Sequence, residues 1–310
     1  MPTLESTVSD VSPTLFDDLW SYVGRVRPRI EAALEHHLPL AAMPAGAGFN
    51  AVVRDAVFPG GKRLRPVLVL LGAEAVGVQV KGFDLEDYLA AAVAVEYVHT
   101  SSLIFDDLPC MDDARERRGQ NALHVQHGEA LAVLVGLNLM NASYGLMFDK
   151  VTADNCERAI AAHAELVNCI GASGMVVGQS IDLGASDACE ELRQLRNLKT
   201  SALMRLALVL GATLAGGDKH QIRALSSFAV MIGDAYQMRD DVLDMQEDFA
   251  LAVGGRRATT GALESGEAKA MREVNGLVDE AKSLLIERFG DSHAVQMLSL
   301  TADYIARRKS

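Results

Sequence analysis

The sequence predicts an all-α protein, and three observations lead to this fold class. All eight prolines lie at or before Pro109, so the rest of the chain contains none. Proline removes a backbone donor and clashes with the preceding turn, so its absence permits long uninterrupted helices. Strand-type alternation of apolar and polar residues is not evident. Apolar residues instead recur at helical spacing, as in Leu198, Ala202, Leu206, Leu210 and Leu214.

The helices can be assigned in order from these patterns. A first helix over residues 15–38 should break or end near Pro28, and residues 41–48, with one proline and two glycines, should form a connection. The polar, glycine-rich stretch 247–261 should interrupt the last third. Several helices are apolar on more than one face, which predicts inner helices wrapped by outer ones. The remaining predicted helices span residues 64–76, 85–107, 128–148, 155–171, 190–214, 220–246, 266–289 and 292–308.

The composition fits one domain with a substantial core. The chain has 310 residues, of which 49% are apolar. It carries 29 Lys plus Arg against 41 Asp plus Glu, a formal charge of −12. A sequence-general nucleic-acid binder is excluded, because such proteins need a concentrated excess of basic residues. We expect a loose arm over residues 1–15 and a single domain over residues 16–310.

The cysteine content and the N-terminus predict a cytoplasmic protein. The chain has four cysteines and no C-x-x-C pair, too few for a disulfide framework at this length. The N-terminus is acidic and hydroxyl-rich where a secretory signal would be basic and then apolar. The most apolar windows, residues 67–78 and 131–140, are shorter than the roughly 20 residues that span a bilayer. We therefore expect no transmembrane segment.

Two acidic clusters interrupt otherwise apolar helices. The first, DDLPCMDD, spans residues 106–113, and the second, DDVLD, spans residues 240–244. In the first cluster, Pro109 should open the helix and let Asp106 and Asp112 reach one ion. One such cluster alone would more often be a solvated helix end. Two of them on apolar helices need positive counter-charge, and their hard oxygen donors suit Mg²⁺ completed by substrate phosphates.

Basic residues gather apart from these clusters. The segment GGKRLRP, residues 60–66, places three cations after two glycines at a helix start, where free amides favour an anion. Its spacing is not that of the nucleotide-binding loop GxxxxGK[ST]. Arg117 and Arg118 follow the first acidic cluster, and Lys199 precedes Thr200 further along the chain. Separate acidic and basic groups describe a site for two polyphosphate ligands, with metal supplying the missing positive charge.

Several ordered motifs run from about residue 60 to residue 244. They are GGKRLRP, His99, DDLPCMDD followed by RRG, Gly178-Gln179 with Asp182, Lys199-Thr200, and Tyr236-Gln237 before the second acidic cluster. In this order they resemble the short-chain trans-isoprenyl diphosphate synthases of the polyprenyl synthetase family, and within it the bacterial geranylgeranyl diphosphate synthases. The resemblance implies an all-α bundle of inner helices around a central cavity, and a homodimer.

The resemblance also implies an activity and a role for each matching residue. The activity is a prenyl transfer that joins isopentenyl diphosphate to an allylic diphosphate by ionisation, condensation and elimination. Three Mg²⁺ ions are implied, with ligands Asp106, Asp112 and Asp240 supported by Asp107, Asp241 and Asp244. The groups implied to hold the allylic diphosphate are Arg117, Lys199 and Gln237. Those implied to stabilise the carbocation are Lys199, Thr200 and Gln237. Isopentenyl diphosphate is implied to bind Lys62, Arg65, His99 and Arg118.

Small residues before the first acidic cluster predict the product length. The growing tail should follow the helix that carries Asp106, away from the metals. In this family a Tyr or Phe five positions upstream closes the tunnel near a C15 product, whereas this chain has Ser101 there and Ser102 beside it. We therefore expect geranylgeranyl diphosphate, a C20 product, with farnesyl diphosphate, the C15 product, as the alternative.

Departures from the family pattern keep other hypotheses open. The family's lysines after the second cluster are absent, and only Arg256 or Arg257 could replace them. Gln120-Asn121 likewise stands where Lys-Pro is usual. A non-catalytic regulatory subunit would be expected to lose metal ligands first, yet both clusters are present. A terpene cyclase on the same scaffold would need no isopentenyl diphosphate pocket, yet the basic residues of that pocket are present. Both observations favour the synthase.

Overall fold

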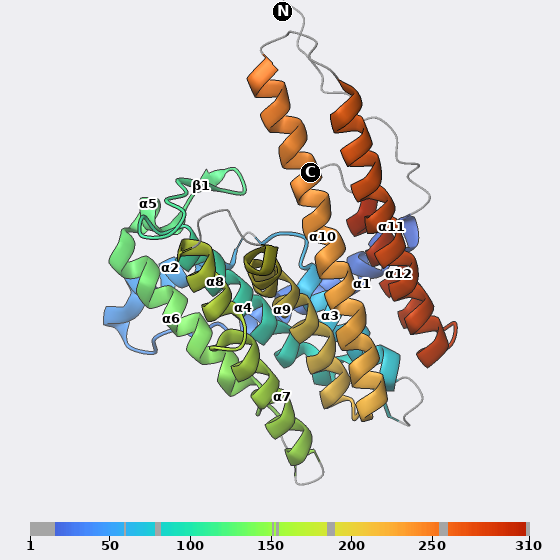
Figure 1. The fold of residues 1–310 in the computed structure, drawn as a ribbon. Helices are drawn as coiled ribbons and strands as arrows, with labels where there is room; N and C mark the ends of the chain where they lie inside the picture. Colours follow the sequence, from blue (N-terminus) through green and yellow to red (C-terminus); the bar gives the residue numbers. More distant parts are fainter. Residues whose placement is uncertain are drawn as a thin grey trace, which may run out of the picture.

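The computed structural model describes residues 16–58, 60–77, 82–150, 152, 155–184, 190–253 and 260–307, and it confirms the all-α fold. Within these ranges, side chains are described except at residues 182, 184, 190–200, 240–253 and 260–265. The expected arm over residues 1–15 lies outside the description. Figure 1 shows a bundle of helices, beside which α10 (Lys219–Val253) and α11 (Thr260–Phe289) run as a long neighbouring pair.

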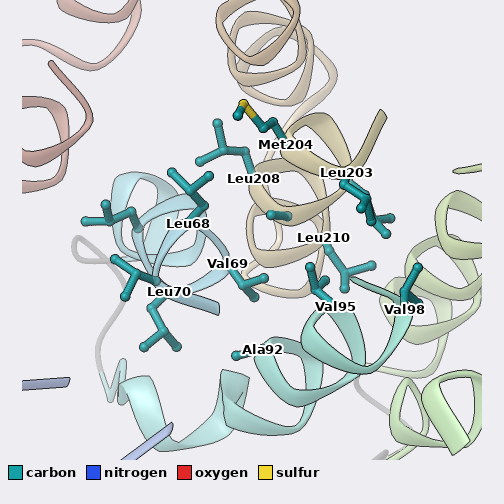
Figure 2. Packing of buried hydrophobic residues seen from close by; sticks show 14 of the residues in the cluster. Leu68, Val69, Leu70, Ala92, Val95, Val98, Leu203, Met204, Leu208 and Leu210 are labelled. Atoms are coloured by element: carbon teal, nitrogen blue, oxygen red, sulfur yellow. The ribbon is translucent and has the colours of Figure 1, made fainter. Parts of the chain in front are cut away.

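Three apolar helices lie at the centre of the bundle, namely α3 (Leu64–Gly77), α4 (Leu89–Asp106) and α9 (Glu190–Leu214). In α4 every residue from 89 to 101 is buried, which agrees with its lack of a polar face. Side chains from all three helices meet in one core. Figure 2 shows this contact, with labelled residues Leu68, Val69, Leu70, Ala92, Val95, Val98, Leu203, Met204, Leu208 and Leu210.

Two glycines allow α3 and α9 to approach unusually closely. A Cβ atom at Gly72 would lie 2.3 Å from the carbonyl oxygen of Leu208. A Cβ atom at Gly211 would lie 1.9 Å from the carbonyl oxygen of Val69. Any side chain at either position would force the two backbones apart. These contacts hold α9, which carries two of the predicted site residues, firmly against the core.

The remaining helices surround this centre, which agrees with the prediction of inner helices wrapped by outer ones. Two short 3-10 helices, Pro44–Gly46 and Leu85–Tyr88, join them. The surrounding helices are α1 (Asp17–His36), α2 (Ala47–Val57), α5 (Leu123–His127), α6 (Glu129–Leu146), α7 (Cys156–Ile170), α8 (Met175–Gly184), α10, α11 and α12 (His293–Arg307).

The helix boundaries differ from the prediction in several places. α1 continues through Pro28 instead of breaking there. Pro28 and Gly24 are both exposed, so the carbonyl that loses its helical donor lies on the water-facing side, where solvent can replace it. α10 continues through residues 247–253, where a break was expected. The first glycine of that stretch comes only at position 254, and the residues before it include good helix formers.

Three short helices and one hairpin were not predicted. The helices are α2, α5 and α8, and α2 begins inside the expected connection over residues 41–48. In the hairpin, β1 (Glu116–Arg117) pairs antiparallel with β2 (Gln120–Asn121). Arg118 and Gly119 form its turn with φ values of 56° and 74°. Two successive positive φ angles are typical of a type I′ turn, which matches the twist of the paired strands.

Two stretches within the described residues are long and apolar enough to cross a membrane. The first, residues 85–106, is 78% buried inside the bundle, as expected of the core helix α4. The second, residues 156–181, is interrupted by the turn at residues 171–174 between α7 and α8. The apolar character of the first stretch is therefore explained by its packing inside the bundle, and the second stretch is not one continuous helix.

Candidate active site

The first acidic cluster lies where α4 ends. The helix stops at Asp106, and residues 107–112 continue as turns around Pro109. The Asp112 N–H donates to the Asp106 carbonyl oxygen at 2.9 Å, so the chain folds back on itself. Asp106 and Asp107 are buried, whereas Asp112 is exposed. The opened helix end thus brings together two aspartates that are six positions apart in sequence.

Arg117 faces this acidic turn from the hairpin. Its Nε donates to Oδ1 of Asp107 at 3.0 Å, and its Nη2 reaches the same oxygen. Hydrogen bonding to Asp107 raises the pKa of Arg117 despite partial burial, and the charges of Asp106 and Asp112 raise it further. All three carboxylates therefore lie within electrostatic reach of one guanidinium group. Asp107 is the carboxylate that Arg117 engages directly.

Arg118 of the hairpin turn belongs to a second group of side chains, here called the cationic pocket, with Arg65 and His99. Arg65 Nη1 lies 3.1 Å from His99 Nε2, and Arg118 Nη2 lies 3.4 Å from the same nitrogen. A Cβ atom at Gly61 would lie 3.1 Å from the Arg118 guanidinium carbon, so glycine leaves room for that group. The Nε of Arg65 is buried and has no hydrogen-bond partner among the described residues. Two guanidinium groups thus meet at His99, and one of them has an unsatisfied donor, which suits an anion.

His99 is neutral in this pocket. Burial lowers the pKa of His99 well below its ordinary value, and the charges of Arg65 and Arg118 lower it further. The geometry agrees, because a guanidinium can only donate and His99 Nε2 must therefore accept. An anion placed among these groups would offset the guanidinium charges that disfavour protonation.

Arg63 does not contribute to the pocket, although the sequence placed it among three cations. Its side chain is 1% exposed and pairs with Glu96 at 2.6 Å and with Glu31 at 3.0 Å. It also donates to the carbonyl oxygen of Val57 at 2.9 Å. The backbone of Arg63 has a φ of 55° and its side chain is buried, whereas the preceding Lys62 is exposed and Arg65 belongs to the cationic pocket. Arg63 is therefore a structural cation.

The second acidic cluster lies on α10, next to α9. The two helices nearly touch at Gly233, where a Cβ atom would lie 2.3 Å from Ser201 Oγ. Ser201 directly follows Thr200, and Gln237, which is half-buried, lies about one helical turn beyond Gly233. Tyr236 interacts electrostatically with Arg65, so this part of α10 borders the cationic pocket. The packing brings the predicted residues of α9 and α10 toward the same region.

The side chains of some predicted residues lie outside the description. They are Lys199, Thr200, Asp240, Asp241 and Asp244, and the replacement candidates Arg256 and Arg257 lie outside it entirely. Among the described side chains, no group of three or more His, Cys, Asp or Glu residues is arranged to hold a metal ion. A metal at the first cluster would therefore need further donors from elsewhere.

An apolar cavity of about 520 Å³ begins at Asp106. It lies between the end of α4, the middle of α6 and the helix α8, and its lining is mostly apolar. α8 was not predicted, although Met175, Gln179 and Leu183 recur at steps of four and could have indicated one lining face. The lining residues are Ser102, Phe105, Asp106, Met111, Met140, Ile170, Met175, Val176, Gln179, Ser180 and Leu183.

The two serines predicted to control product length have different environments. Ser102 lines the cavity. Ser101 is fully buried on another face of α4, where its hydroxyl lies 2.7 Å from the Tyr97 carbonyl oxygen and 3.0 Å from that of Gly136 on α6. The structure therefore places Ser102, and not Ser101, at the cavity wall.

Comparison with known proteins places this geometry in a family. The polyprenyl synthetase family model matches residues 47–254. A chloroplastic geranylgeranyl pyrophosphate synthase of Capsicum annuum is 38% identical over 84% of this chain and 71% of its own length. The farnesyl diphosphate synthase of Escherichia coli K12 is 36% identical over 80% of this chain and 85% of its own length.

A solved structure agrees with these sequence relatives. The apo crystal structure of a FPP/GFPP synthase from Zymomonas mobilis superposes with a TM-score of 0.79 at 30% identity. The match covers 93% of this chain and 99% of that chain. The likeness therefore extends over nearly the whole fold, including the helices that bear the acidic and basic residues described above. This chain belongs to the polyprenyl synthetase family.

Proposed function

We propose that this protein is a Mg²⁺-dependent trans-prenyltransferase that condenses isopentenyl diphosphate with an allylic diphosphate. One observation carries the proposal. Residues of α4 contribute to a partly buried acidic turn, to a cationic pocket with an unsatisfied donor and to an apolar cavity. A diphosphate with a hydrocarbon tail needs these three environments together. The proposal includes one catalytic domain over residues 16–310, acting in the cytoplasm.

Two diphosphates would be held by different residues. Arg65 and Arg118 both contact His99, and with Lys62 these residues suit isopentenyl diphosphate. Arg117 contacts Asp107 of the acidic turn and suits the allylic diphosphate, with Lys199 and Gln237 from α9 and α10. Neighbouring arginines of the hairpin thus have different partners, which suits two anion sites.

The first acidic cluster fits Mg²⁺ by the chemistry of its donors. Asp106 and Asp112 offer hard oxygen ligands on a folded-back turn, and Asp107 holds Arg117 beside them. Asp240, with support from Asp241 and Asp244, would complete the site from α10, for three ions in all. When bound, these ions supply positive charge that stabilises the departing pyrophosphate. The cationic side chains add to this stabilisation and hold the attacking double bond near the allylic carbon.

The cavity would hold the growing tail. It begins at Asp106 and is lined mainly by apolar side chains, which exclude water from the hydrocarbon. The small Ser102 leaves the wall open where a large side chain would narrow it. These features support a C20 product, geranylgeranyl diphosphate, over the C15 product farnesyl diphosphate.

Product analysis tests the function directly. The purified chain is incubated with Mg²⁺, isopentenyl diphosphate and farnesyl diphosphate, and the products are identified by mass spectrometry. An elongated C20 diphosphate is expected. A hydrocarbon with free pyrophosphate would indicate a terpene cyclase, and no turnover would indicate a non-catalytic subunit. Extension of geranyl diphosphate alone, with no use of farnesyl diphosphate, would indicate the C15 synthase.

The Ser102→Tyr variant should make a shorter product. A phenol ring at this position would project into the cavity and fill part of its 520 Å³. We expect the C20 fraction to fall in favour of C15, measured by chromatography of the dephosphorylated products. Ser102→Ala is the matched control and should keep the wild-type distribution. An unchanged distribution in Ser102→Tyr would contradict the proposed path of the tail.

The Leu137→Lys variant should weaken a homodimer. Leu134 and Leu137 on α6 are each more than half exposed, and Ile160 on α7 adds to the exposed apolar side chains of these two helices. Such exposure suits a second copy of the chain. We expect the variant to sediment as a monomer where the wild type sediments as a dimer. Ile286→Lys, at an equally exposed apolar position on α11, should remain dimeric. Dissociation by both variants would argue against this face.

A further inference from the structure

Lys62, two residues before the start of α3, contacts two aromatic side chains. Its ammonium group donates to the hydroxyl of Tyr304 on α12 and lies 5.2 Å from the centre of that ring. It also lies 6.0 Å from the ring centre of Trp20 on α1. Both distances are within the range of cation–π attraction. Two helices that are distant in sequence therefore meet at one exposed lysine.

The aromatic side chains are themselves fixed. The Tyr304 ring packs edge-on against Trp20 with ring centres 5.1 Å apart, and against Phe16 at 5.7 Å. The neighbouring Asp303 pairs with Lys282 of α11 at 2.9 Å, which ties this turn of α12 to the bundle. Trp20 and Tyr304 thus form a rigid support, here called the aromatic clamp.

The backbone of Lys62 is next to residues of the pocket proposed for isopentenyl diphosphate. Lys62 follows Gly61, which lies against the guanidinium of Arg118. Arg65, in the first turn of α3, comes three residues after Lys62 and contacts His99. The lysine that the aromatic clamp holds therefore belongs to the same short segment as the cations of the pocket.

We propose that Trp20 and Tyr304 are positioning residues that hold Lys62 for the diphosphate of isopentenyl diphosphate. The inference rests on the proposed function, because it assumes that the pocket binds this substrate. A lysine has a long flexible stem, and ordering it on binding costs entropy. The aromatic clamp orders the stem in advance. Since an ammonium group has three donors and gives one to Tyr304, donors remain for phosphate oxygens.

Equilibrium binding of isopentenyl diphosphate, measured by calorimetry without an allylic partner, tests the proposal. We expect Tyr304→Leu to weaken binding about three- to tenfold, from the loss of one cation–π contact and one hydrogen bond to a charged group. Tyr304→Phe should lie between this variant and the wild type, because it keeps the ring. Phe16→Leu removes packing against the same ring but keeps both contacts of Tyr304 with Lys62, so it serves as the control and should weaken binding less than Tyr304→Leu.

A double-mutant cycle separates positioning from a general structural effect. If the aromatic clamp acts through Lys62, Tyr304→Leu should have no further effect on binding in a Lys62→Ala background. Independent, multiplied losses would overturn the proposal. Tighter binding in Tyr304→Leu would also overturn it, because Tyr304 would then compete with the substrate for Lys62.

The intrinsic fluorescence of Trp20 gives a second readout. Trp20 is the chain's single tryptophan, so its emission reports on this site alone. Isopentenyl diphosphate should change the emission with the same Kd as calorimetry, and Lys62→Ala should abolish that change. Binding by calorimetry without any emission change would contradict the proposal.

The same experiments distinguish failure of this inference from failure of the proposed function. If the wild type binds isopentenyl diphosphate with the predicted responses but makes no elongated product, the positioning role stands and the synthase activity fails. If the wild type makes the product while the cycle shows independent losses, the activity stands and the positioning role fails. If the wild type binds no isopentenyl diphosphate, the positioning role is refuted together with the pocket assignment.

Discussion

The Asp106→Asn variant is expected to lose turnover by roughly 10³-fold, comparable to removing a group that stabilises charge in a transition state. Asn keeps the size of the side chain but removes the negative charge that would hold Mg²⁺. Among the predicted ligands whose side chains the structure describes, Asp106 is the one that is buried and lines the cavity. Because Asn has nearly the same shape, its replacement should affect catalysis more than folding. Steady-state product formation measures the effect, and circular dichroism checks the fold.

Asp113→Asn provides the matched control for this prediction. Asp113 belongs to the same cluster but is exposed and adopts a φ of 48°, a backbone conformation that Asn tolerates well. We expect its turnover to stay within a few-fold of wild type. The concentration of Mg²⁺ needed for half-maximal rate should rise in Asp106→Asn and not in the control. A near-normal rate in Asp106→Asn would remove the basis for a metal site at the end of α4.

The sequence predicts the long helices of this fold well and the short elements poorly. Helices such as α3 and α9 have sustained apolar periodicity, and their limits agree closely with the prediction. The hairpin is only two residues long on each strand, too short for any alternation to register. Its formation depends on Arg118 and Gly119 both adopting positive φ, and only the glycine indicates this in the sequence.

Helix rotation explains why the sequence could not separate Ser101 from Ser102. Adjacent residues on a helix point about 100° apart, so the two serines can have different surroundings. Both serines are small, so neither their size nor their position before Asp106 shows which of them lines the cavity. The contact of Ser101 with the α6 backbone at Gly136 settles it, and that contact depends on how α4 and α6 pack.

The same limit applies to the three cations of residues 62–65. The local pattern makes Lys62, Arg63 and Arg65 alike, since each follows the glycines at a helix start, and only the family resemblance assigned Lys62 and Arg65 to the pocket without Arg63. The structure gives them three different environments: an aromatic clamp, a buried ion pair and the cationic pocket. The partners that decide this, such as Glu96 and Tyr304, lie far along the chain. Local patterns cannot reveal which cation meets which partner.

The buried ion pair leads to the second large prediction. Replacing Glu96 with alanine should lower the free energy of unfolding by about 3–5 kcal/mol, the usual effect of breaking a buried pair. Arg63 and Glu96 are 1% and 3% exposed, so the remaining guanidinium would stay buried with only part of its charge compensated by Glu31. Urea unfolding followed by circular dichroism measures the loss.

Glu31→Ala tests whether burial, and not simply pairing, produces this effect. Glu31 contacts the same guanidinium but its side chain is 28% exposed, so solvent can screen the charge that is left. The loss of unfolding free energy in Glu31→Ala should be clearly smaller than in Glu96→Ala, and equal losses would contradict the argument.

Arg63 also lies between Lys62 and Arg65 in the chain, so its buried contacts hold the backbone from which both of these side chains extend. In conditions where Glu96→Ala remains folded, we therefore also expect weaker binding of isopentenyl diphosphate, because a loosened Arg63 would release its two functional neighbours together.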